Sequence, residues 1–151
     1  MSTKILNFKH EFVEFIPEHI IDGVIYVSIP YATVIHRCAC GCSKEVVTPL
    51  SPTDWKIIFD GKSISLDPSI GNWSFDCQSH YFIRNSRVLW CDQWSKDRIN
   101  QGRTRDTANK EDYYEFKDSQ VVKENNSIKP VEHLIPNSKG VMDRIREFWP
   151  F

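Results

Sequence analysis

Four cysteines in this sequence are spaced so that they could share one metal ion. Cys38, Cys40 and Cys42 alternate along a short stretch, and Cys77 follows further along the chain. Alternating thiolates in a tight turn can converge on one ion, and zinc favours four soft ligands in a tetrahedron. Gly41 lets the backbone between them turn with a positive φ. We therefore expect one structural Zn²⁺ ion held by these four thiols.

Other interpretations of the cysteines stay open. His36 or His80 could replace one thiol as a ligand, and Cys40 could be a buried bystander, because alternate residues of a strand point to opposite faces. A redox pair is a further alternative, although Cys-x-Cys lacks the spacing of the Cys-x-x-Cys oxidoreductases. We expect Cys91 to be an ordinary small buried residue rather than a ligand. Five cysteines cannot all pair as intramolecular disulfides.

A serine and a histidine near Cys77 predict a second kind of chemistry. Ser69 lies in a Pro-Ser-Ile-Gly segment, which we expect to be a loop with an exposed hydroxyl and with N–H groups suited to an oxyanion site. His80 is the usual type of base for a serine nucleophile. Ser79 is the alternative nucleophile, but neighbours on a strand face opposite ways. We expect Ser69 to face His80, with Asp67 or Asp76 as candidates to orient the imidazole.

The same residues also have structural explanations. Serines that follow prolines are common in turns, and a histidine beside a metal ligand can bind or support the metal. A three-ligand zinc ion could activate water, but thiolate-rich sites are usually closed and structural. The residues alone therefore leave a hydrolase, a non-catalytic zinc module and a thiol-redox protein as competing functions.

Short strands would position these residues. Runs of β-branched and aromatic residues, punctuated by proline, glycine and asparagine, predict a small, mainly β domain of hairpins over residues 1–94. The predicted strands cover residues 23–30, 31–35, 45–48, 55–59, 63–66, 80–83 and 87–90. Residues 5–8 and 12–15 are either another strand pair or irregular cover.

The tryptophans and the C-terminal part carry separate expectations. Four tryptophans are expected to fill the core, and Trp73 could also wall a groove for an extended peptide. Residues 95–138 are charged and polar, which predicts a solvated tail or long loop. Residues 139–151 again contain apolar residues, at roughly helical spacing, which predicts a short C-terminal docking helix.

The composition excludes several classes of partner. With 19 basic and 20 acidic residues among 151, the chain has no electrostatic case for binding nucleic acid or an anionic membrane. No segment approaches the roughly 20 apolar residues that a membrane span needs. The N-terminal residues do not resemble a signal peptide. We therefore expect a cytoplasmic protein, where reduced thiols favour metal binding over disulfides.

The order of these motifs resembles a family of small bacterial proteins from ubiquitin-like conjugation systems, first described only as a domain of unknown function. The resemblance covers roughly residues 20–95. It is carried by Cys-x-Cys-Gly-Cys at 38–42, Ser-Leu-x-Pro-Ser-Ile at 65–70, Cys-x-Ser-His-aromatic at 77–81 and Arg-Val-x-Trp at 87–90.

This resemblance implies a function. Members of the family look like serine-type peptidases with a structural zinc, which trim or release a ubiquitin-like protein and occur with E1-like and E2-like enzymes. The motif positions that carry over are Ser69, Ser79 and His80. The partner implied is a ubiquitin-like protein or its conjugates. The alternative is a non-catalytic zinc module that interacts with the same conjugation system.

Overall fold

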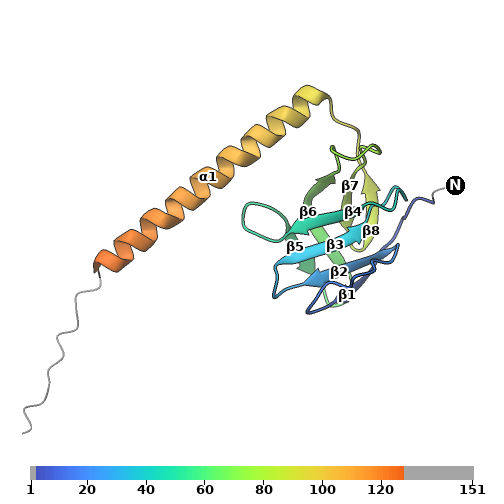
Figure 1. Cartoon of the computed structure of the whole chain (residues 1–151), viewed down its shortest axis with the longest axis horizontal. Helices are drawn as coiled ribbons and strands as arrows, with labels where there is room; N and C mark the ends of the chain where they lie inside the picture. Colours follow the sequence, from blue (N-terminus) through green and yellow to red (C-terminus); the bar gives the residue numbers. More distant parts are fainter. Residues whose placement is uncertain (1–2, 128–151) are drawn as a thin grey trace, which may run out of the picture. The chain divides into compact units, whose positions relative to one another are not determined.

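The computed structural model describes residues 3–127, and its β domain consists of two four-stranded sheets (Figure 1). The first sheet has the order β1-β2-β3-β4 and the second β5-β6-β7-β8. The strands of the first sheet are β1 (Lys9–Phe12), β2 (Val24–Ser28), β3 (Thr33–Arg37) and β4 (Glu45–Pro49). Those of the second are β5 (Lys56–Phe59), β6 (Ile64–Gly71), β7 (His80–Arg84) and β8 (Arg87–Trp90). The predicted mainly β fold is confirmed.

The first sheet differs from the prediction at its N-terminal edge. A single strand, β1, forms where residues 5–8 and 12–15 were expected to be either a strand pair or irregular cover, and it runs parallel to β2 with His10 opposite Ile25. Phe8, just before β1, is buried in the core, whereas Phe12 at its end is 48% exposed. The neighbouring pairs β2–β3 and β3–β4 are antiparallel.

The second sheet is a meander, and local chemistry explains its tight turns. In the β5–β6 turn, the Asp60 carboxylate accepts hydrogen bonds from the N–H groups of Lys62 and Ser63 at 2.9 and 2.6 Å. In the β7–β8 turn, Asn85 and Ser86 both have positive φ, at 48° and 63°. Two successive left-handed residues are typical of the tight hairpin turns that match strand twist. The strands predicted at residues 55–59 and 63–66 therefore form one hairpin, and those predicted at residues 80–83 and 87–90 form another.

The core lies between the two sheets. Its buried residues come from both, including Ile25 and Val34 of the first sheet and Leu66 and Ile83 of the second. The expectation that four tryptophans fill this core is wrong for residues 3–127. The buried core consists of aliphatic residues together with Phe8, Tyr81 and Cys38, and among the described tryptophans only Trp55 packs against it. The described tryptophans are only partly buried or exposed, which leaves them free to line a surface cavity.

A long helix, α1 (Lys96–Ser127), forms within residues 95–138, where a solvated tail or long loop was expected. Residues 128–138 of that segment lie outside the described residues. Ser95 caps the helix, because its hydroxyl lies 3.3 Å from the Arg98 N–H, and Asp97 places an acidic group in the first turn. Residues 96–127 contain no proline. Their polar composition correctly predicted solvent exposure but did not exclude a helix, since charged residues such as Glu, Lys and Arg are good helix formers.

The chain divides into two compact units, Met1–Tyr114 and Glu115–Phe151. The first unit contains both sheets and the N-terminal part of α1, and every site described below lies within it. The short helix predicted for residues 139–151 lies outside the described residues. Among the helices that the structure describes, none combines the length and the apolar character needed to cross a membrane.

Candidate active site and metal centre

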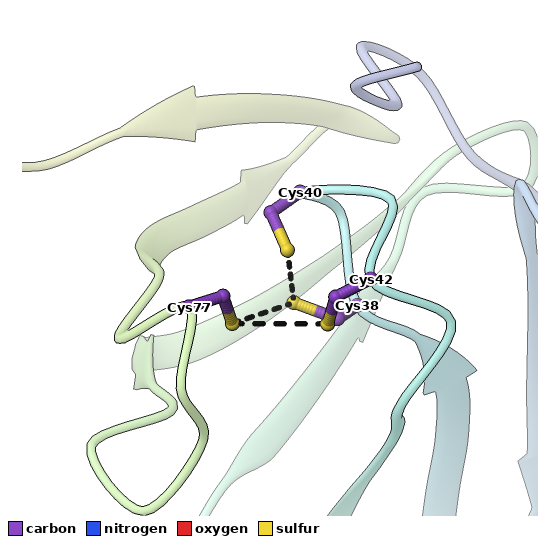
Figure 2. A group of neighbouring side chains, drawn as sticks. All are labelled: Cys38, Cys40, Cys42 and Cys77. Atoms are coloured by element: carbon purple, nitrogen blue, oxygen red, sulfur yellow. Dashed lines mark hydrogen bonds between the residues drawn. The ribbon is translucent and has the colours of Figure 1, made fainter. Parts of the chain in front are cut away.

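The four predicted metal-binding cysteines lie together. Their sulfur atoms are all within 4.8 Å of one another, and Figure 2 shows them converging from two chain segments that are distant in sequence. The Sγ–Sγ distances are 3.4 Å for Cys38–Cys40, 3.9 Å for Cys38–Cys77 and 3.7 Å for Cys42–Cys77. The cluster therefore joins the turn after β3 in the first sheet to the β6–β7 loop in the second.

The spacing of these sulfurs fits a tetrahedral metal site. Four thiolates at ~2.3 Å from a central zinc ion would lie ~3.8 Å from one another. The observed distances of 3.4, 3.9 and 3.7 Å bracket that value. The cluster could thus bind a metal ion, and thiolate sulfur is a soft ligand of the kind that zinc accepts.

Backbone hydrogen bonds shape the two segments that carry the thiols. After β3, the Cys38 N–H donates to the Lys44 carbonyl at 2.8 Å, and the Gly41 N–H donates to the Cys38 carbonyl at 3.0 Å. Gly41 has a φ of 85°, as its predicted role in the turn requires. In the second segment, Gln78 has a φ of 41° and its N–H donates to the Phe75 carbonyl at 3.0 Å. Tight turns on both sides therefore hold the sulfurs together.

Two buried polar side chains support the thiols. The Asn72 amide donates to Ser79 Oγ at 2.9 Å, which leaves the Ser79 hydroxyl proton free to point at Cys38 Sγ, 3.0 Å away. Burial raises the pKa of the Cys38 thiol. Burial also acts to raise the pKa of Cys77, but hydrogen bonds with neighbouring groups, first Ser79 and then Cys40 and Cys42, outweigh it and lower that pKa to about 7. Ser79 therefore supports the thiol cluster.

The alternative ligands do not join this cluster. His36 is fully buried, and its Nε2 lies 3.0 Å from the Tyr81 hydroxyl. Burial lowers the pKa of His36 to about 3, so the ring stays neutral. Cys91 also lies apart, with its Sγ 3.8 Å from the Leu89 carbonyl.

The predicted contact between Ser69 and His80 is present on the other face of β6 and β7. Ser69 Oγ lies 3.0 Å from His80 Nε2. The register explains this contact, because Gly71 pairs with His80 and Ser69 is two residues before Gly71, so both are on the His80 face. Ser69 lies on strand β6, not on the predicted loop. A register shift between Leu66 and Ile70 places Ser69 itself in a bulged part of β6, and such bulges commonly re-aim a side chain beside an active site.

The His80 ring is enclosed on its other sides. Its Nδ1 lies 2.8 Å from the main-chain carbonyl oxygen of Asp92. The indole rings of Trp73 and Trp94 stack on each other at 5.6 Å between centroids, and they lie 5.0 and 5.3 Å from the imidazole. A Cβ atom on Gly71 would lie 2.4 Å from Trp73 Nε1. Only glycine at position 71 therefore lets Trp73 pack beside His80.

A cavity of about 420 Å³ opens at the Ser69–His80 pair. One side is formed by residues 53–55 and by Pro68, Ser69 and Gly71 of the β domain. Trp73 and Trp94 also line it, as do residues of the N-terminal part of α1. The volume is within the usual range for small-molecule and peptide sites. Trp73 thus forms part of the wall of a groove, as the sequence analysis considered for an extended peptide.

Several neighbours of His80 were not found from the sequence. Asp67 and Asp76 were the candidates to orient the imidazole, but Asp67 pairs with Arg84 at 2.7 Å and Asp76 with Lys44 at 2.8 Å. The observed partner of His80 Nδ1 is the backbone carbonyl of Asp92. Every residue has such a carbonyl, so the residue type at this position does not indicate the contact. Trp94 could have been suspected as an isolated aromatic residue at the start of a polar segment.

The partly buried thiol cluster joins the turn after β3 to the β6–β7 loop, and the Ser69–His80 pair lies on the opposite side of the segment that leads into β7. A serine hydroxyl within hydrogen-bond reach of an imidazole is an arrangement suited to hydrolytic chemistry. The family model for the bacterial ubiquitination-like system serine protease (BubE) matches residues 12–91, more than half of the chain. The chain belongs to this family. A search of curated proteins and a search of solved structures each found no match. The match contains all four clustered cysteines, Ser69 and His80, and it ends before Asp92, Trp94 and α1.

Proposed function

We propose that this protein is a serine peptidase that processes or releases a bacterial ubiquitin-like protein, with Ser69 as nucleophile and His80 as general base. The observation that carries the proposal is the 3.0 Å distance between Ser69 Oγ and His80 Nε2 in a chain of a serine protease family. A serine hydroxyl becomes a useful nucleophile only when a base lies within hydrogen-bond reach.

The contacts of His80 support the direction of proton transfer. When Nδ1 carries the proton, it can donate to the Asp92 carbonyl, 2.8 Å away. Nε2 is then unprotonated and can accept the proton of the Ser69 hydroxyl. The Asp92 carbonyl therefore holds the position that a carboxylate has in a Ser-His-Asp triad. Because it is neutral, it orients the ring but stabilises the imidazolium less than a carboxylate would.

The reaction follows from these positions. Ser69 Oγ bonds to the carbonyl carbon of the scissile bond while its proton moves to His80 Nε2. The imidazolium then gives this proton to the leaving amine, and the acyl group stays on Ser69 as an ester. Water, deprotonated by the same nitrogen, hydrolyses the ester and restores the hydroxyl. N–H groups near Ser69 remain the predicted oxyanion donors.

The thiol cluster would hold the metal in a structural role. Cys38, Cys40, Cys42 and Cys77 would bind one Zn²⁺ ion, which supplies a cross-link between the two sheets. The cluster and the Ser69–His80 pair share the short segment that runs from Cys77 to His80. Fixing Cys77 therefore fixes the start of β7, where His80 lies. We propose residues 1–94 as the peptidase domain.

The family also indicates the setting. We propose that the substrate is the ubiquitin-like protein of the system or one of its conjugates, that E1-like and E2-like enzymes are functional partners, and that the protein acts in the cytoplasm. Membership of a family named for a bacterial ubiquitination-like system supports the choice of substrate. Neither nucleic acid nor a membrane is expected as a partner, given the near-neutral charge balance.

Cleavage of a defined fusion tests the proposal. The substrate is a bacterial ubiquitin-like protein carrying a C-terminal peptide extension, and the release of that extension is followed by mass spectrometry. Ser69→Ala and His80→Ala should each lower cleavage at least ~1000-fold, because the two groups act as a unit. Ser74→Ala is the matched control, since Ser74 lines the same cavity. Full activity in both Ser69→Ala and His80→Ala, with unchanged metal content, would contradict the assignment.

The four-thiol cluster also supports a second candidate, a non-catalytic zinc module of the conjugation system. This candidate predicts binding of the ubiquitin-like protein without turnover. Binding would depend on the cysteines and would be indifferent to Ser69. Isothermal titration of the same fusion protein with the wild type, Ser69→Ala and Cys42→Ser separates the two candidates.

A further inference from the structure

Strand β6 has a free edge beside the nucleophile. On this side β5 pairs with β6 only as far as Lys56 opposite Asp67. The chain before Lys56 turns away, because the Trp55 N–H donates to the Pro49 carbonyl and the Trp55 carbonyl accepts from the Ser51 N–H, each at 3.1 Å. Among residues 3–127, no strand pairs with this side of β6 from Pro68 to Gly71.

The backbone of Gly71 faces this free edge. The Asn72 N–H donates to the Ser79 carbonyl at 2.9 Å, so the backbone groups of Asn72 point towards β7. Ile70 likewise pairs with Tyr81 of β7. Since successive residues of a strand direct their N–H and C=O groups to opposite edges, those of Gly71 point away from β7. They are therefore available to a chain that lies alongside.

The free edge opens into the cavity that contains Ser69 and His80. Pro68, Ser69 and Gly71 all line this cavity of about 420 Å³. Residues 53–55, which precede β5, line it as well. A chain that pairs with the free edge would thus continue the line of β5 and pass the Ser69 hydroxyl.

The N-terminal part of α1 forms another wall of the cavity. Lys110 of α1 pairs with Asp54 at 2.5 Å, and the Arg98 guanidinium lies 4.4 Å from the centre of the Trp94 ring. Arg103 and Asp106 line the cavity beside them. The groove is therefore bounded by the free edge of β6, by polar side chains of α1 and by the indole rings of three tryptophans, Trp55, Trp73 and Trp94. This mixture suits a peptide, which offers main-chain groups to the strand edge and side chains to the indole rings.

We propose that the substrate binds here as an extended polypeptide strand that pairs with the free edge of β6 at Gly71 and presents its scissile bond to Ser69. Strand addition of this kind draws affinity from main-chain hydrogen bonds, and it requires an unfolded segment such as a chain terminus. The inference rests on the proposed function, since it assigns the binding mode of the substrate at that same site.

Peptidyl phosphonates test the binding mode without a known substrate sequence. The probes are acetylated alanine peptides of one to four residues that end in a diphenyl phosphonate. Ser69 Oγ would form a bond to phosphorus, phenoxide would leave, and the hydroxyl proton would pass to His80. We expect the second-order rate constant of inactivation to rise at least ~10-fold from one to three residues, because each added main-chain hydrogen bond gives roughly 2- to 10-fold.

Methylation of single amides makes the test specific for strand pairing. Successive residues of a paired strand direct their amides to opposite edges. In the tetrapeptide probe, two adjacent inner residues are therefore methylated on nitrogen one at a time. Methylation of the amide that faces β6 should slow inactivation ~3-fold or more, and methylation of the neighbouring amide, which faces away, should have little effect. Equal effects at both positions, or at neither, would overturn strand addition.

Amide hydrogen exchange of the full-length protein, measured by NMR, shows whether the backbone of β6 is paired when a probe is bound. The Gly71 amide should exchange at least ~10-fold more slowly once the tripeptidyl phosphonate is attached, whereas the Ile70 amide, which faces β7, should change little. Diisopropyl fluorophosphate, which has no peptide, should leave the exchange rate of the Gly71 amide unchanged.

The two reagents separate failure of the binding mode from failure of the proposed function. If diisopropyl fluorophosphate labels Ser69 but peptide length has no effect on inactivation, strand addition is wrong and the assignment of Ser69 as nucleophile is retained. If neither reagent labels Ser69, the proposed function itself is wrong.

Discussion

Ser79 and His80 are adjacent in the chain, but their side chains serve opposite faces of the sheet. Ser79 Oγ lies 3.0 Å from Cys38 Sγ in the thiol cluster, and His80 Nε2 lies 3.0 Å from Ser69 Oγ at the cavity. The alternation of side chains along a strand separates the two sites by a single peptide unit. The cluster can therefore fix the position of the histidine without taking part in the reaction.

Replacing Ser79 should weaken metal binding without removing the nucleophile. In Ser79→Ala, the buried Asn72 amide and Cys38 both lose the hydroxyl that now lies between them. We expect metal affinity to fall about 10- to 100-fold and the free energy of unfolding to fall by about 1–3 kcal/mol. Competition with a chelator measures the affinity, and denaturant unfolding measures the stability.

The matched variant for this comparison is Ser69→Ala. It should leave metal affinity unchanged and abolish cleavage, whereas Ser79→Ala saturated with zinc should keep most of its activity. If Ser79→Ala at full metal occupancy is as inactive as Ser69→Ala, the nucleophile has been assigned to the wrong serine.

Replacing one clustered cysteine should destabilise the β domain. Cys42→Ser removes one of four convergent thiols and would leave a poor metal site. Because a bound metal contributes directly to folding free energy, we expect a loss of about 3 kcal/mol or more. Atomic absorption gives the metal content, and thermal unfolding gives the stability.

Cys91→Ser is the control for the cysteine prediction, because Cys91 lies outside the cluster. It should keep one equivalent of metal and a melting temperature close to that of the wild type. The structural role of the cluster fails if Cys42→Ser is as stable as Cys91→Ser and both proteins lack metal.

The cysteine spacing predicted this cluster well, and the reason is chemical. Alternating thiols are rare, and a turn that contains a glycine can bring them together through local backbone geometry alone. The strand positions also followed from local patterns, because Asp60-Gly61 and Asn85-Ser86 form turns through their own backbone preferences.

The surroundings of His80 could not be predicted in the same way. The Asp92 carbonyl reaches Nδ1 because of where the chain runs after β8, and a main-chain group leaves no signature in the sequence. The bulge in β6 that accompanies Ser69 depends on its register with β7. Helix α1 was missed because a segment that is polar all round carries no periodicity to read.

A methyl group at position 71 should disturb catalysis more than folding. Gly71 does not have a positive φ, so its backbone accepts alanine. The new Cβ would, however, meet the Trp73 indole at 2.4 Å and force it away from His80. We expect kcat to fall about 100-fold, the cost typical of a misplaced catalytic group. Steady-state kinetics on the ubiquitin-like fusion measures the effect.

Gly102→Ala provides a graded comparison for this prediction. Its Cβ would lie 3.3 Å from the far edge of the Trp94 ring, a milder contact. Alanine also favours a helix over glycine by about 1 kcal/mol. We expect kcat to change less than ~5-fold for this variant, given that the contact is tight rather than overlapping. An equal loss in both variants would show that Trp73 has no special effect on His80.

The central claim is that Ser69 is a nucleophile activated by His80, and site mapping of a serine-reactive reagent tests it most directly. Wild-type protein treated with diisopropyl fluorophosphate and analysed by peptide mass spectrometry should carry one adduct, on Ser69. The adduct should be absent in Ser69→Ala, form at least ~100-fold more slowly in His80→Ala, and form normally in metal-saturated Ser79→Ala. An adduct on Ser79, or one on Ser69 that forms at the same rate without His80, would contradict the account.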